Sequence, residues 1–241
     1  MSKIIKINKG LDINLLGKTE AKVTALPMAD SYAVSPLDFE GVVPKLLVKV
    51  GEQVKAGDAL FFSKNDSRVL FTSPVSGTVT AVNRGEKRKV LNVTVQPDAT
   101  QSFKEFNIPA IEKTSKEDAT KLLLEAGLWP LIIQRPYGII ANPDDQPKAI
   151  FVSGFDSAPL AADSDVVLAN DKANLQKGFD VLARLTAGKV HLSLNAKAEN
   201  KVFEGLKGVE IHEFAGPHPA GNVGVQIHHI SPIQKGETVW T

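Results

Sequence analysis

The spacing of apolar and polar residues changes along the chain, and the change comes near residue 99. Up to about residue 98, apolar and polar positions alternate and glycine and proline are frequent, a pattern that predicts short β-strands and no helix. The strands expected in this half cover residues 46–50, 59–62, 69–72, 77–82 and 90–95. Short strands separated by regular turns are typical of a small sandwich or barrel.

After residue 99 the pattern switches between helical periodicity and continuous apolar runs. One helix is expected over residues 116–126, because Ser115 can cap its N-terminus and Gly127 follows its last turn. Two further helices are expected over residues 174–187 and 198–206. The continuous apolar runs predict strands over residues 149–152, 165–168, 190–194 and 209–212. Strands that alternate with helices favour a mainly parallel sheet with helices on its faces.

The first half resembles the lipoyl/biotinyl-type barrel-sandwich domain over about residues 40–97. Residues 48–60 contain two glycine turns, and residues 72–79 place a proline before a strand and a glycine at its start. In carrier members of that family, a lysine on an exposed hairpin holds the prosthetic group, and the matching position here is Asp66. Because Lys64 lies two residues away from that position, we expect a scaffold that carries no lipoyl or biotinyl group.

The composition excludes several classes of chemistry. Cysteine is absent, which excludes disulfides, thiolate-bound iron–sulfur clusters, cysteine zinc sites and a cysteine nucleophile. The 28 basic and 27 acidic residues leave a formal net charge of +1, so no net field attracts nucleic acid or an acidic membrane. Lysines interrupt the apolar residues of stretch 1–7, which therefore lacks the apolar core of a signal peptide. No apolar run approaches the roughly 20 residues of a membrane-spanning helix.

The second half lacks the common motifs of nucleotide binding and hydrolysis. Neither G-x-G-x-x-G nor G-x-x-x-x-G-K-[ST] occurs, and no G-x-S-x-G turn is present. The five histidines show no H-E-x-x-H motif and no evident carboxylate partner. Two of them, His228 and His229, are adjacent, and in a strand they would point to opposite faces. We therefore expect neither a metal site nor a catalytic residue in this chain.

Residues 214–229, with the run Gly-Pro-His-Pro-Ala-Gly and the ending Ile-His-His, resemble the A subunits of sodium-translocating NADH:quinone oxidoreductases. Further agreement with that family is found over residues 4–16, 83–88, 125–129, 134–137 and 150–163. The resemblance covers essentially the whole chain, and members of the family are longer. The last residues, Thr238–Thr241, have the pattern of a strand that is just beginning. We therefore expect an N-terminal part of a longer polypeptide rather than a natural edge strand at this end.

The resemblance implies a peripheral subunit on the cytoplasmic face of a bacterial inner membrane. Its partners are then the other subunits, above all the membrane-embedded B subunit, of a complex that oxidises NADH, reduces ubiquinone or menaquinone and exports sodium. The chain would take part in this NADH:ubiquinone reductase without doing the bond-making chemistry, which falls to flavins of other subunits. The expected fold is a β barrel-sandwich hybrid domain over residues 1–100 and an α/β Rossmann-like domain with a mainly parallel sheet over residues 101–241.

Relatives of this family place a glycine-rich loop and an acidic Glu-x-Glu-Pro segment around a flavin. Residues 125–130 of this chain hold a single glycine, and Ala158 stands where the second acid of that segment would be. Trp129 is too bulky for the close backbone approach that glycine allows. We therefore expect a scaffold with no FMN and no covalently bound cofactor, for which ubiquinone or menaquinone is the candidate substrate.

The loop around His218 is the expected functional surface. Its candidate quinone- or partner-binding residues are Gly216, Pro217, His218, Pro219 and Gly221. Proline orders the loop in advance, and the imidazole of His218 can hydrogen-bond a quinone carbonyl or a partner. The alternative is a loop that only packs between domains. For the whole chain, the alternatives are a free-standing flavin- and NADH-binding oxidoreductase and a lipoyl- or biotin-type carrier module.

Overall fold

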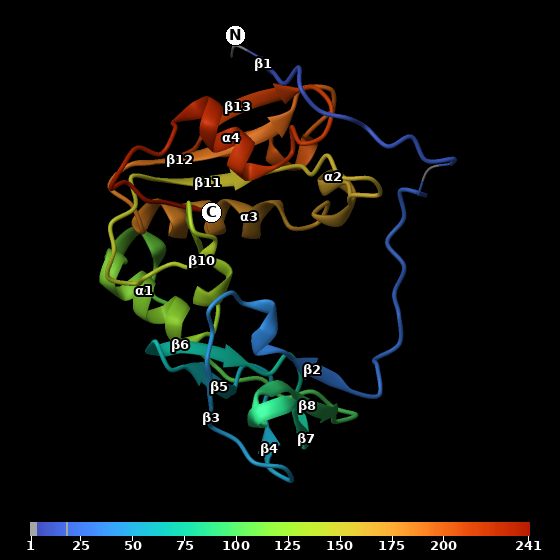
Figure 1. Cartoon of the computed structure of the whole chain (residues 1–241), viewed down its shortest axis with the longest axis vertical. Helices are drawn as coiled ribbons and strands as arrows, with labels where there is room; N and C mark the ends of the chain where they lie inside the picture. The colour runs from blue at the N-terminus through green and yellow to red at the C-terminus, as the bar shows by residue number, and fades with distance from the viewer. Residues whose placement is uncertain (1–3, 18) are drawn as a thin grey trace. The chain divides into compact units, whose positions relative to one another are not determined.

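The computed structural model describes residues 4–17 and 19–241, which belong to two compact units (Figure 1). The unit that we call the α/β unit combines the N-terminal residues up to Ala25 with Gln146–Thr241. The unit that we call the β unit covers Leu26–Asp145. Residues 1–3, which begin the lysine-interrupted N-terminal stretch, lie outside the described residues, as does residue 18.

The β unit contains two antiparallel sheets. The three-stranded sheet has the order β3-β5-β6, with bounds Pro44–Leu46, Ala59–Ser63 and Asp66–Thr72. The four-stranded sheet has the order β2-β8-β7-β4, with bounds Tyr32–Val34, Val90–Pro97, Gly77–Arg84 and Gln53–Val54. The strands expected over residues 59–62, 69–72, 77–82 and 90–95 are thus confirmed.

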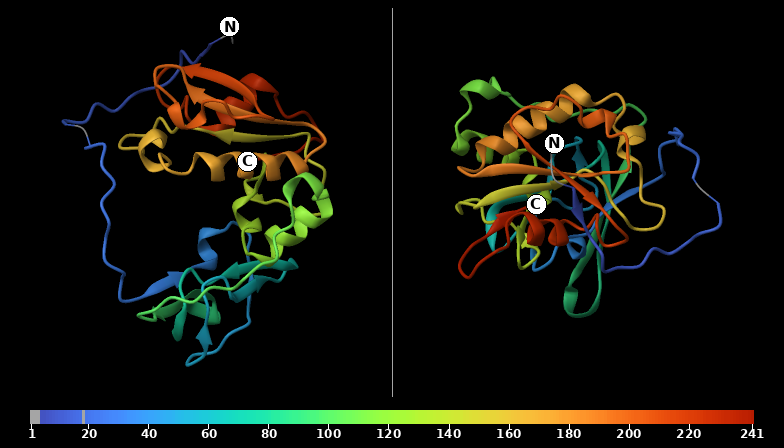
Figure 2. Two further views of the ribbon diagram at one scale, coloured as in Figure 1. Left: turned by 180° about the vertical axis from the view of Figure 1, so that it is seen from behind. Right: turned by 90° about the horizontal axis from the view of Figure 1, so that it is seen from above.

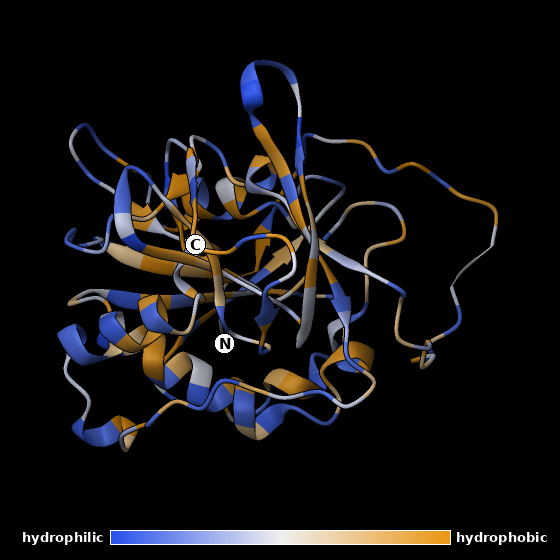
Figure 3. Ribbon diagram, turned by 90° about the horizontal axis from the view of Figure 1, so that it is seen from below, coloured by the Kyte–Doolittle hydropathy of each residue, from blue (hydrophilic) through white to orange (hydrophobic). Residues whose placement is uncertain are grey.

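Burial explains why apolar and polar residues alternate along the strands of the β unit. Val79 in β7 is fully buried and the next residue, Thr80, is exposed, so one face of the strand packs and the other is wet. In the other sheet the rings of Phe61 and Phe71 stack with their centroids 4.7 Å apart. Figure 3 shows hydrophobic residues along the strands and hydrophilic residues at the turn that joins β7 to β8. The core of the unit therefore lies on the apolar faces of its strands.

The strand expected over residues 46–50 is wrong in position, because β3 ends at Leu46. The chain then leaves the three-stranded sheet and turns at Gly51, whose N–H donates a hydrogen bond of 2.8 Å to the Val79 carbonyl in the other sheet. The Glu52 carboxylate closes the turn by accepting a hydrogen bond of 2.9 Å from the main chain three residues earlier. This segment carries the chain between sheets, which the alternation of apolar residues does not reveal.

Helix α1, Lys116–Glu125, follows the two sheets. The Ser115 side chain accepts a hydrogen bond of 3.0 Å from the Asp118 N–H, and Gly127 takes φ +69° after the last turn. The expected cap and stop are therefore confirmed. Further elements of the β unit are η1 Pro36–Asp38, η2 Glu86–Arg88, η3 Ile111–Lys113, η4 Trp129–Leu131 and the antiparallel pair β9 Ile133–Arg135 and β10 Ile139–Ile140.

The strands of the α/β unit lie side by side in the order β1-β13-β12-β11-β14. Their bounds are Ile5–Lys6, Glu210–Ala215, Lys189–Asn195, Ala149–Ser153 and Val239–Trp240. Each neighbouring pair among these strands is parallel. The strands expected over residues 149–152, 190–194 and 209–212 are confirmed. The C-terminal pattern also forms a strand, whose Val239 and Trp240 are fully buried.

Helices α3, Lys172–Arg184, and α4, Val223–Ile230, lie on opposite faces of these strands (Figure 2). Helix α4 packs on β11, where Phe151 and Ile227 share a hydrophobic cluster with Val239. Helix α3 packs on β12. Because β12 lies on one side of β11 and β14 on the other, the direction in which strands are added reverses at β11.

The strand expected over residues 165–168 is wrong, because Ser164–Val167 form helix α2. The Asp163 carboxylate accepts a hydrogen bond of 2.9 Å from the Asp165 N–H and caps the first turn. The three apolar residues 166–168 fit a short strand as well as a turn of helix. The cap, which the apolar pattern does not include, decides between them.

The helix expected over residues 198–206 is also wrong. Only the 3-10 turn η5, Lys201–Phe203, forms there. Asn200 before it has φ +57° and Gly205 after it has φ +75°, both in the left-handed region that interrupts a right-handed helix. The two apolar residues of the turn, Val202 and Phe203, are nevertheless buried.

Two other expectations about helices need correction. The helix expected over residues 174–187 forms, but it begins at Lys172 and ends at Arg184. His228 and His229 do not lie in a strand with side chains on opposite faces. They lie on helix α4, where the side chains of neighbouring residues are about 100° apart around the axis. Asn222 begins this helix, since its side chain accepts a hydrogen bond of 2.8 Å from the Gly224 N–H.

Candidate functional site

The candidate site is the connection between β13 and α4, residues 214–224, which we call the proline loop. Phe214 and Ala220 are buried in one hydrophobic cluster with Ile7 of the N-terminal segment. Between these two anchors the loop rises to the surface, and His218 is half-buried there. The loop is therefore fixed at both ends by the core of the α/β unit.

The N-terminal segment holds one side of the proline loop. The pairing of β1 with β13 brings this segment to the loop (Figure 1). The Leu11 N–H donates a hydrogen bond of 3.0 Å to the His218 carbonyl, and the His218 N–H donates one of 2.8 Å to Asp12 Oδ1. A Cβ atom at Gly10 would lie 2.0 Å from the His218 carbonyl oxygen, so only glycine permits this approach.

Ser157 holds the other side of the loop. Its Oγ accepts a hydrogen bond of 2.8 Å from the Gly221 N–H and lies 3.1 Å from His218 Nδ1. When the hydroxyl donates to Nδ1, the neutral imidazole carries its proton on Nε2 and can donate from that atom. Sequence reasoning assigned no role to Ser157, although it lies within segment 150–163, which supported the resemblance.

A cleft of about 630 Å³ lies beside the proline loop at the carboxyl end of β11. Its walls come from the segment 153–164 and from His218, Gly221, Asn222 and Val223. Asp156 is the one charged residue in this lining, which contains no lysine and no arginine among the described residues. A ligand in this cleft would therefore meet one carboxylate and no cationic side chain among the described lining residues.

The structure brings together only some of the predicted loop residues. His218 and Gly221 line the cleft. Gly216 lies against β1 instead, where a Cβ atom would come within 2.2 Å of the Ile7 carbonyl oxygen. Pro217 and Pro219 flank His218 in the chain and are half-buried. Of these residues, His218 is the one whose side chain faces the cleft with a hydrogen-bonding group.

Two residues that mark the departure from flavin-binding relatives have packing roles in the β unit. Gly127 lies against Thr72, so that a Cβ atom would come within 2.4 Å of the Thr72 methyl carbon. Trp129 is fully buried, and its Nε1 donates a hydrogen bond of 2.8 Å to the Ala141 carbonyl. Gly127 and Trp129 thus serve the packing of the β unit. The expectation that the chain binds no FMN stays a prediction.

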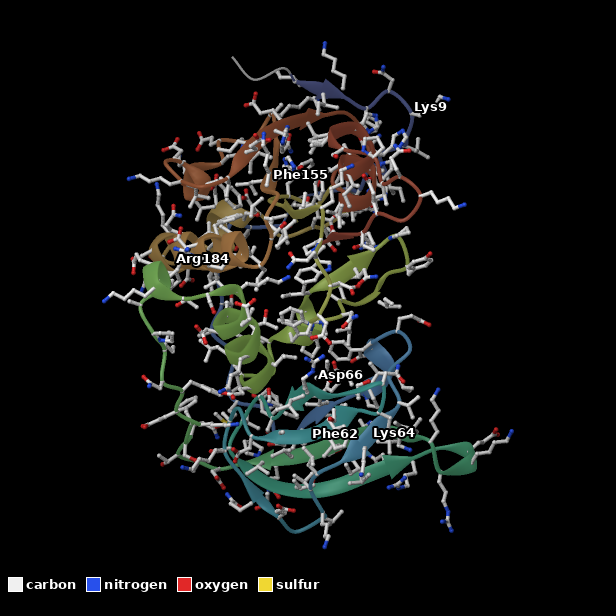
Figure 4. The ribbon with its side chains drawn as sticks, turned by 90° about the vertical axis from the view of Figure 1, so that its left-hand side faces the viewer. Lys9, Phe62, Lys64, Asp66, Phe155 and Arg184 are labelled. Carbon is white, nitrogen blue, oxygen red and sulfur yellow. The ribbon has the colours of Figure 1, made fainter. Side chains whose placement is uncertain are left out.

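The hairpin of β5 and β6 carries the position that matches a carrier lysine (Figure 4). Lys64 is exposed in its turn and Asp66 begins β6. The Arg68 guanidinium binds the carboxylates of Asp66 and Asp144, each at 2.7 Å. The hydrogen bonds from Arg68 hold the pKa of Asp66 below its ordinary value, because they stabilise the charged carboxylate. The expectation that Lys64 carries no prosthetic group stays a prediction.

Sequence reasoning missed one cluster of ligand-type side chains. The expectation that the histidines lack a carboxylate partner is wrong, because Glu210 Oε2 lies 3.5 Å from His191 Nδ1. His212 Nε2 lies 2.9 Å from the same nitrogen. These residues meet through the register of β12 on β13, which no local motif records. The spacing of two between Glu210 and His212, which gives them a common face, is the one signal in the sequence that points to the cluster.

None of the helices in the described part of the chain combines the length and the apolar character that crossing a membrane requires. The described residues define a class of two-domain proteins in which a sandwich of small antiparallel sheets is joined to an α/β unit with parallel strands. This class is the one that the sequence pattern predicted.

Two family models match this chain. The NqrA N-terminal barrel-sandwich hybrid domain matches residues 5–98, and the NqrA second alpha/beta domain matches residues 114–241. The chain therefore belongs to the NqrA family, which confirms the resemblance. The barrel-sandwich and α/β characters of its two halves are confirmed as well. The domain boundary expected between residues 100 and 101 stays a prediction.

Curated relatives are named as the A subunit of Na(+)-translocating NADH-quinone reductase. The chain is 38% identical over 239 residues to the relative from Photorhabdus laumondii. It is 37% identical over 240 residues to that from Saccharophagus degradans and 38% identical over 240 residues to that from Neisseria meningitidis. The matches cover 98–99% of this chain and 53–54% of the relatives. The chain thus spans about half the length of the curated relatives it matches.

Proposed function

We propose that this chain belongs to the A subunit of a sodium-translocating NADH:quinone reductase. In that assembly it is a peripheral subunit on the cytoplasmic face of a bacterial inner membrane, with the other subunits, above all the membrane-embedded B subunit, as its partners. The identity to curated A subunits over nearly the whole chain supports this proposal. The chain supplies a binding surface for ubiquinone or menaquinone, while flavins of other subunits carry the electrons.

The observation that carries the quinone-binding role is the fixation of His218 at the edge of the cleft. Asp12 holds the main chain of this residue and Ser157 holds its ring. A ring whose position and orientation are set before binding loses little entropy when it donates a hydrogen bond to a ligand. His218 Nε2 is then a donor for one carbonyl oxygen of the quinone.

The lining of the cleft supports a quinone head group over a nucleotide. A phosphate-bearing ligand needs cationic side chains or free main-chain N–H groups. The cleft has no lysine or arginine among its described lining residues, and Asn222 already occupies the Gly224 N–H at the beginning of α4. Phe155 and the small apolar residues of segment 153–164 offer contacts to a neutral ring instead.

One observation favours a second candidate, a nucleotide- or flavin-binding oxidoreductase. The cleft lies outside the carboxyl end of β11, where the direction of strand addition reverses, and doubly wound α/β proteins bind nucleotides at this point. The same strand order supports a Rossmann-like α/β unit with a mainly parallel sheet. Thermal unfolding with NADH, FMN or a short-chain ubiquinone distinguishes the candidates, because a ligand that binds the native state raises the melting temperature.

Photolabelling of the assembled complex tests the proposal directly. With a photoreactive ubiquinone analogue, we expect labelled peptides from segments 153–164 or 216–224 of this chain, and competition by excess ubiquinone. Labelling confined to other subunits, with no labelled peptide from these segments, would contradict a quinone site in this cleft.

Substitution of His218 provides the second test. His218→Ala should lower kcat/KM for quinone roughly threefold to tenfold, as expected for one lost hydrogen bond, without unfolding the protein. His228→Ala is the matched control, since His228 is exposed on α4 and does not line the cleft. Equal kcat/KM values for the two variants would remove His218 from the quinone site.

A further inference from the structure

Three ligand-type side chains meet on β12 and β13. The register pairs His191 with Glu210, and His212 lies two residues beyond Glu210, so all three side chains share one face of the sheet. The His191 ring stacks on Phe151 with centroids 4.6 Å apart, and Phe151 packs in the cluster beneath α4. The three side chains therefore lie on the α4 face. Among the residues that the structure describes, they form the group whose ligand atoms lie close enough to share a metal ion.

The distances fit a common ion. His191 Nδ1 lies 2.9 Å from His212 Nε2 and 3.5 Å from Glu210 Oε2, and all three ligand atoms lie within 4.8 Å of one another. A zinc ion with ligand bonds of about 2.0–2.2 Å in tetrahedral geometry separates neighbouring ligand atoms by roughly 3.3–3.6 Å. Small side-chain rotations bring the observed distances into this range.

The burial of the three side chains favours both the binding of a metal ion and its access from solvent. The His191 side chain is only 8% exposed, whereas the Glu210 side chain is 43% exposed, so the cluster has a buried inner wall and opens to solvent on the carboxylate side. Burial lowers the pKa of both His191 and His212, which keeps their rings neutral and their lone pairs available. A hydrated ion can thus reach two neutral imidazoles and one carboxylate.

We propose that His191, Glu210 and His212 form a binding site for a divalent first-row transition-metal ion such as Zn²⁺. Imidazole nitrogens with one carboxylate oxygen suit zinc, iron and related ions and do not suit Mg²⁺. Three protein ligands leave at least one coordination position for water. The proposal does not depend on the quinone-binding role, because none of these residues lines the cleft beside the proline loop.

Without a metal the same residues satisfy one another. The two rings share a hydrogen bond, and Lys189 pairs with Glu210 at the surface. A bound ion replaces the hydrogen bond between the rings and competes with the Lys189 ammonium for the Glu210 carboxylate. Lys189 thus repels the ion and withholds one carboxylate oxygen, so its removal should strengthen metal binding.

Calorimetric titration of the metal-free 241-residue chain with Zn²⁺ tests the proposal. We expect saturable binding of about one ion per chain, whereas Mg²⁺ should give no saturable signal. His212→Gln should weaken Zn²⁺ binding by more than about tenfold, and Lys189→Met should tighten it. Co²⁺ should give visible absorption bands with the parent chain that His212→Gln abolishes.

His228→Gln is the matched control, because His228 is exposed on α4 and outside the cluster. It should bind Zn²⁺ as the parent chain does. Circular dichroism shows whether His212→Gln is folded. If it is not, Glu210→Gln and Lys189→Met replace it in the test, because both change exposed side chains. Glu210→Gln should then weaken Zn²⁺ binding, and Lys189→Met should strengthen it. The absence of saturable binding, or binding that His228→Gln abolishes and His212→Gln leaves unchanged, would overturn the proposal.

Discussion

The main-chain N–H of His218 donates a hydrogen bond of 2.8 Å to the carboxylate of Asp12, a residue 206 positions earlier in the chain. The His218 ring, in contrast, is in contact with the Ser157 hydroxyl. The position of the loop backbone and the orientation of the ring thus depend on different residues. Each can be changed without removing the imidazole itself.

Asp12→Ala should loosen the proline loop while leaving the core intact. The lost hydrogen bond is exposed, so the free energy of unfolding should fall by only about 1 kcal/mol, and proteases should cut the loop more readily. Asp12→Asn keeps an acceptor oxygen and should show a smaller loss. Urea denaturation and limited proteolysis measure both effects, and equal losses in the two variants would speak against this hydrogen bond.

Ser157→Ala should change the ring rather than the loop backbone. It leaves the buried Gly221 N–H without its acceptor, which costs about 1–2 kcal/mol of stability, and it frees the His218 ring to rotate. In the assembled complex the KM for quinone should rise while the amount of this protein in the complex stays constant. Ser157→Thr retains a hydroxyl and should restore most of the affinity. A KM that is unchanged in the alanine variant would show that ring orientation is irrelevant to quinone binding.

Gly10→Ala and Gly178→Ala should have opposite effects. A Cβ atom at Gly10 would come within 2.0 Å of the His218 carbonyl oxygen, so alanine must push the N-terminal segment away from the loop and lower stability. At Gly178, inside α3, no atom outside the neighbouring helix backbone lies within 4 Å of the added carbon, and alanine should stabilise the helix by about 1 kcal/mol. Thermal unfolding measures both changes. A shift of the same sign in the two variants would contradict the close approach at Gly10.

Trp129→Phe should destabilise the β unit. The side chain is fully buried, and phenylalanine both leaves a cavity and removes the donor to the Ala141 carbonyl, a combined loss of about 2–4 kcal/mol. Leu131→Ala, at a position that is 68% exposed, should cost less than about 0.5 kcal/mol. Urea unfolding of the two variants tests whether this tryptophan is a core residue. Similar midpoints would contradict that role.

Acid stability should depend on Arg68. Its guanidinium holds the pKa of Asp66 and Asp144 below their ordinary value of 3.8. A carboxyl group with a lowered pKa stabilises the folded state at higher pH and loses that contribution as the pH falls through its folded-state pKa, because the unfolded chain binds the proton first. Below about pH 4, Arg68→Gln should therefore show a shallower loss of stability than the parent chain.

Urea denaturation at a series of pH values between about 7 and 3 measures this difference. Lys121→Gln is the control, since the Lys121–Glu125 pair is exposed and its atoms are 3.9 Å apart. That variant should follow the parent chain throughout. If Arg68→Gln and the parent lose stability in parallel on acidification, the ion pairs do not contribute to acid stability.

Patterns that are local in the chain predicted their structures well. Alternation in β7 and β8 follows from one buried and one wet face, and the helix after Ser115 follows from a cap and a glycine stop that lie within its own segment. Segment 165–168 is a case in which the local pattern did not predict the structure. Its apolar residues fit two structures, and only the Asp163 cap in its folded setting distinguishes them.

The sites depended on pairing between distant segments. His218 was identified from its own loop, but its contacts with Asp12 and Ser157 require β1 to lie beside β13 and the end of β11 to lie beside the loop. The partnership of Glu210 with His191 requires the register of β12 on β13. A shift of one residue in that register would turn the carboxylate to the other face.

The amino-acid sequence by itself determined the family, the all-β character of the first half, the α/β character of the second half, most strands and the position of the proline loop. These features follow from residue identity and short-range periodicity, which the chain carries whatever its fold. The tertiary structure alone decided how His218 is held, which histidines acquire a carboxylate neighbour and where the cleft opens. Strand order and register set those distances, and they arise from the burial of whole faces rather than from any single stretch of residues.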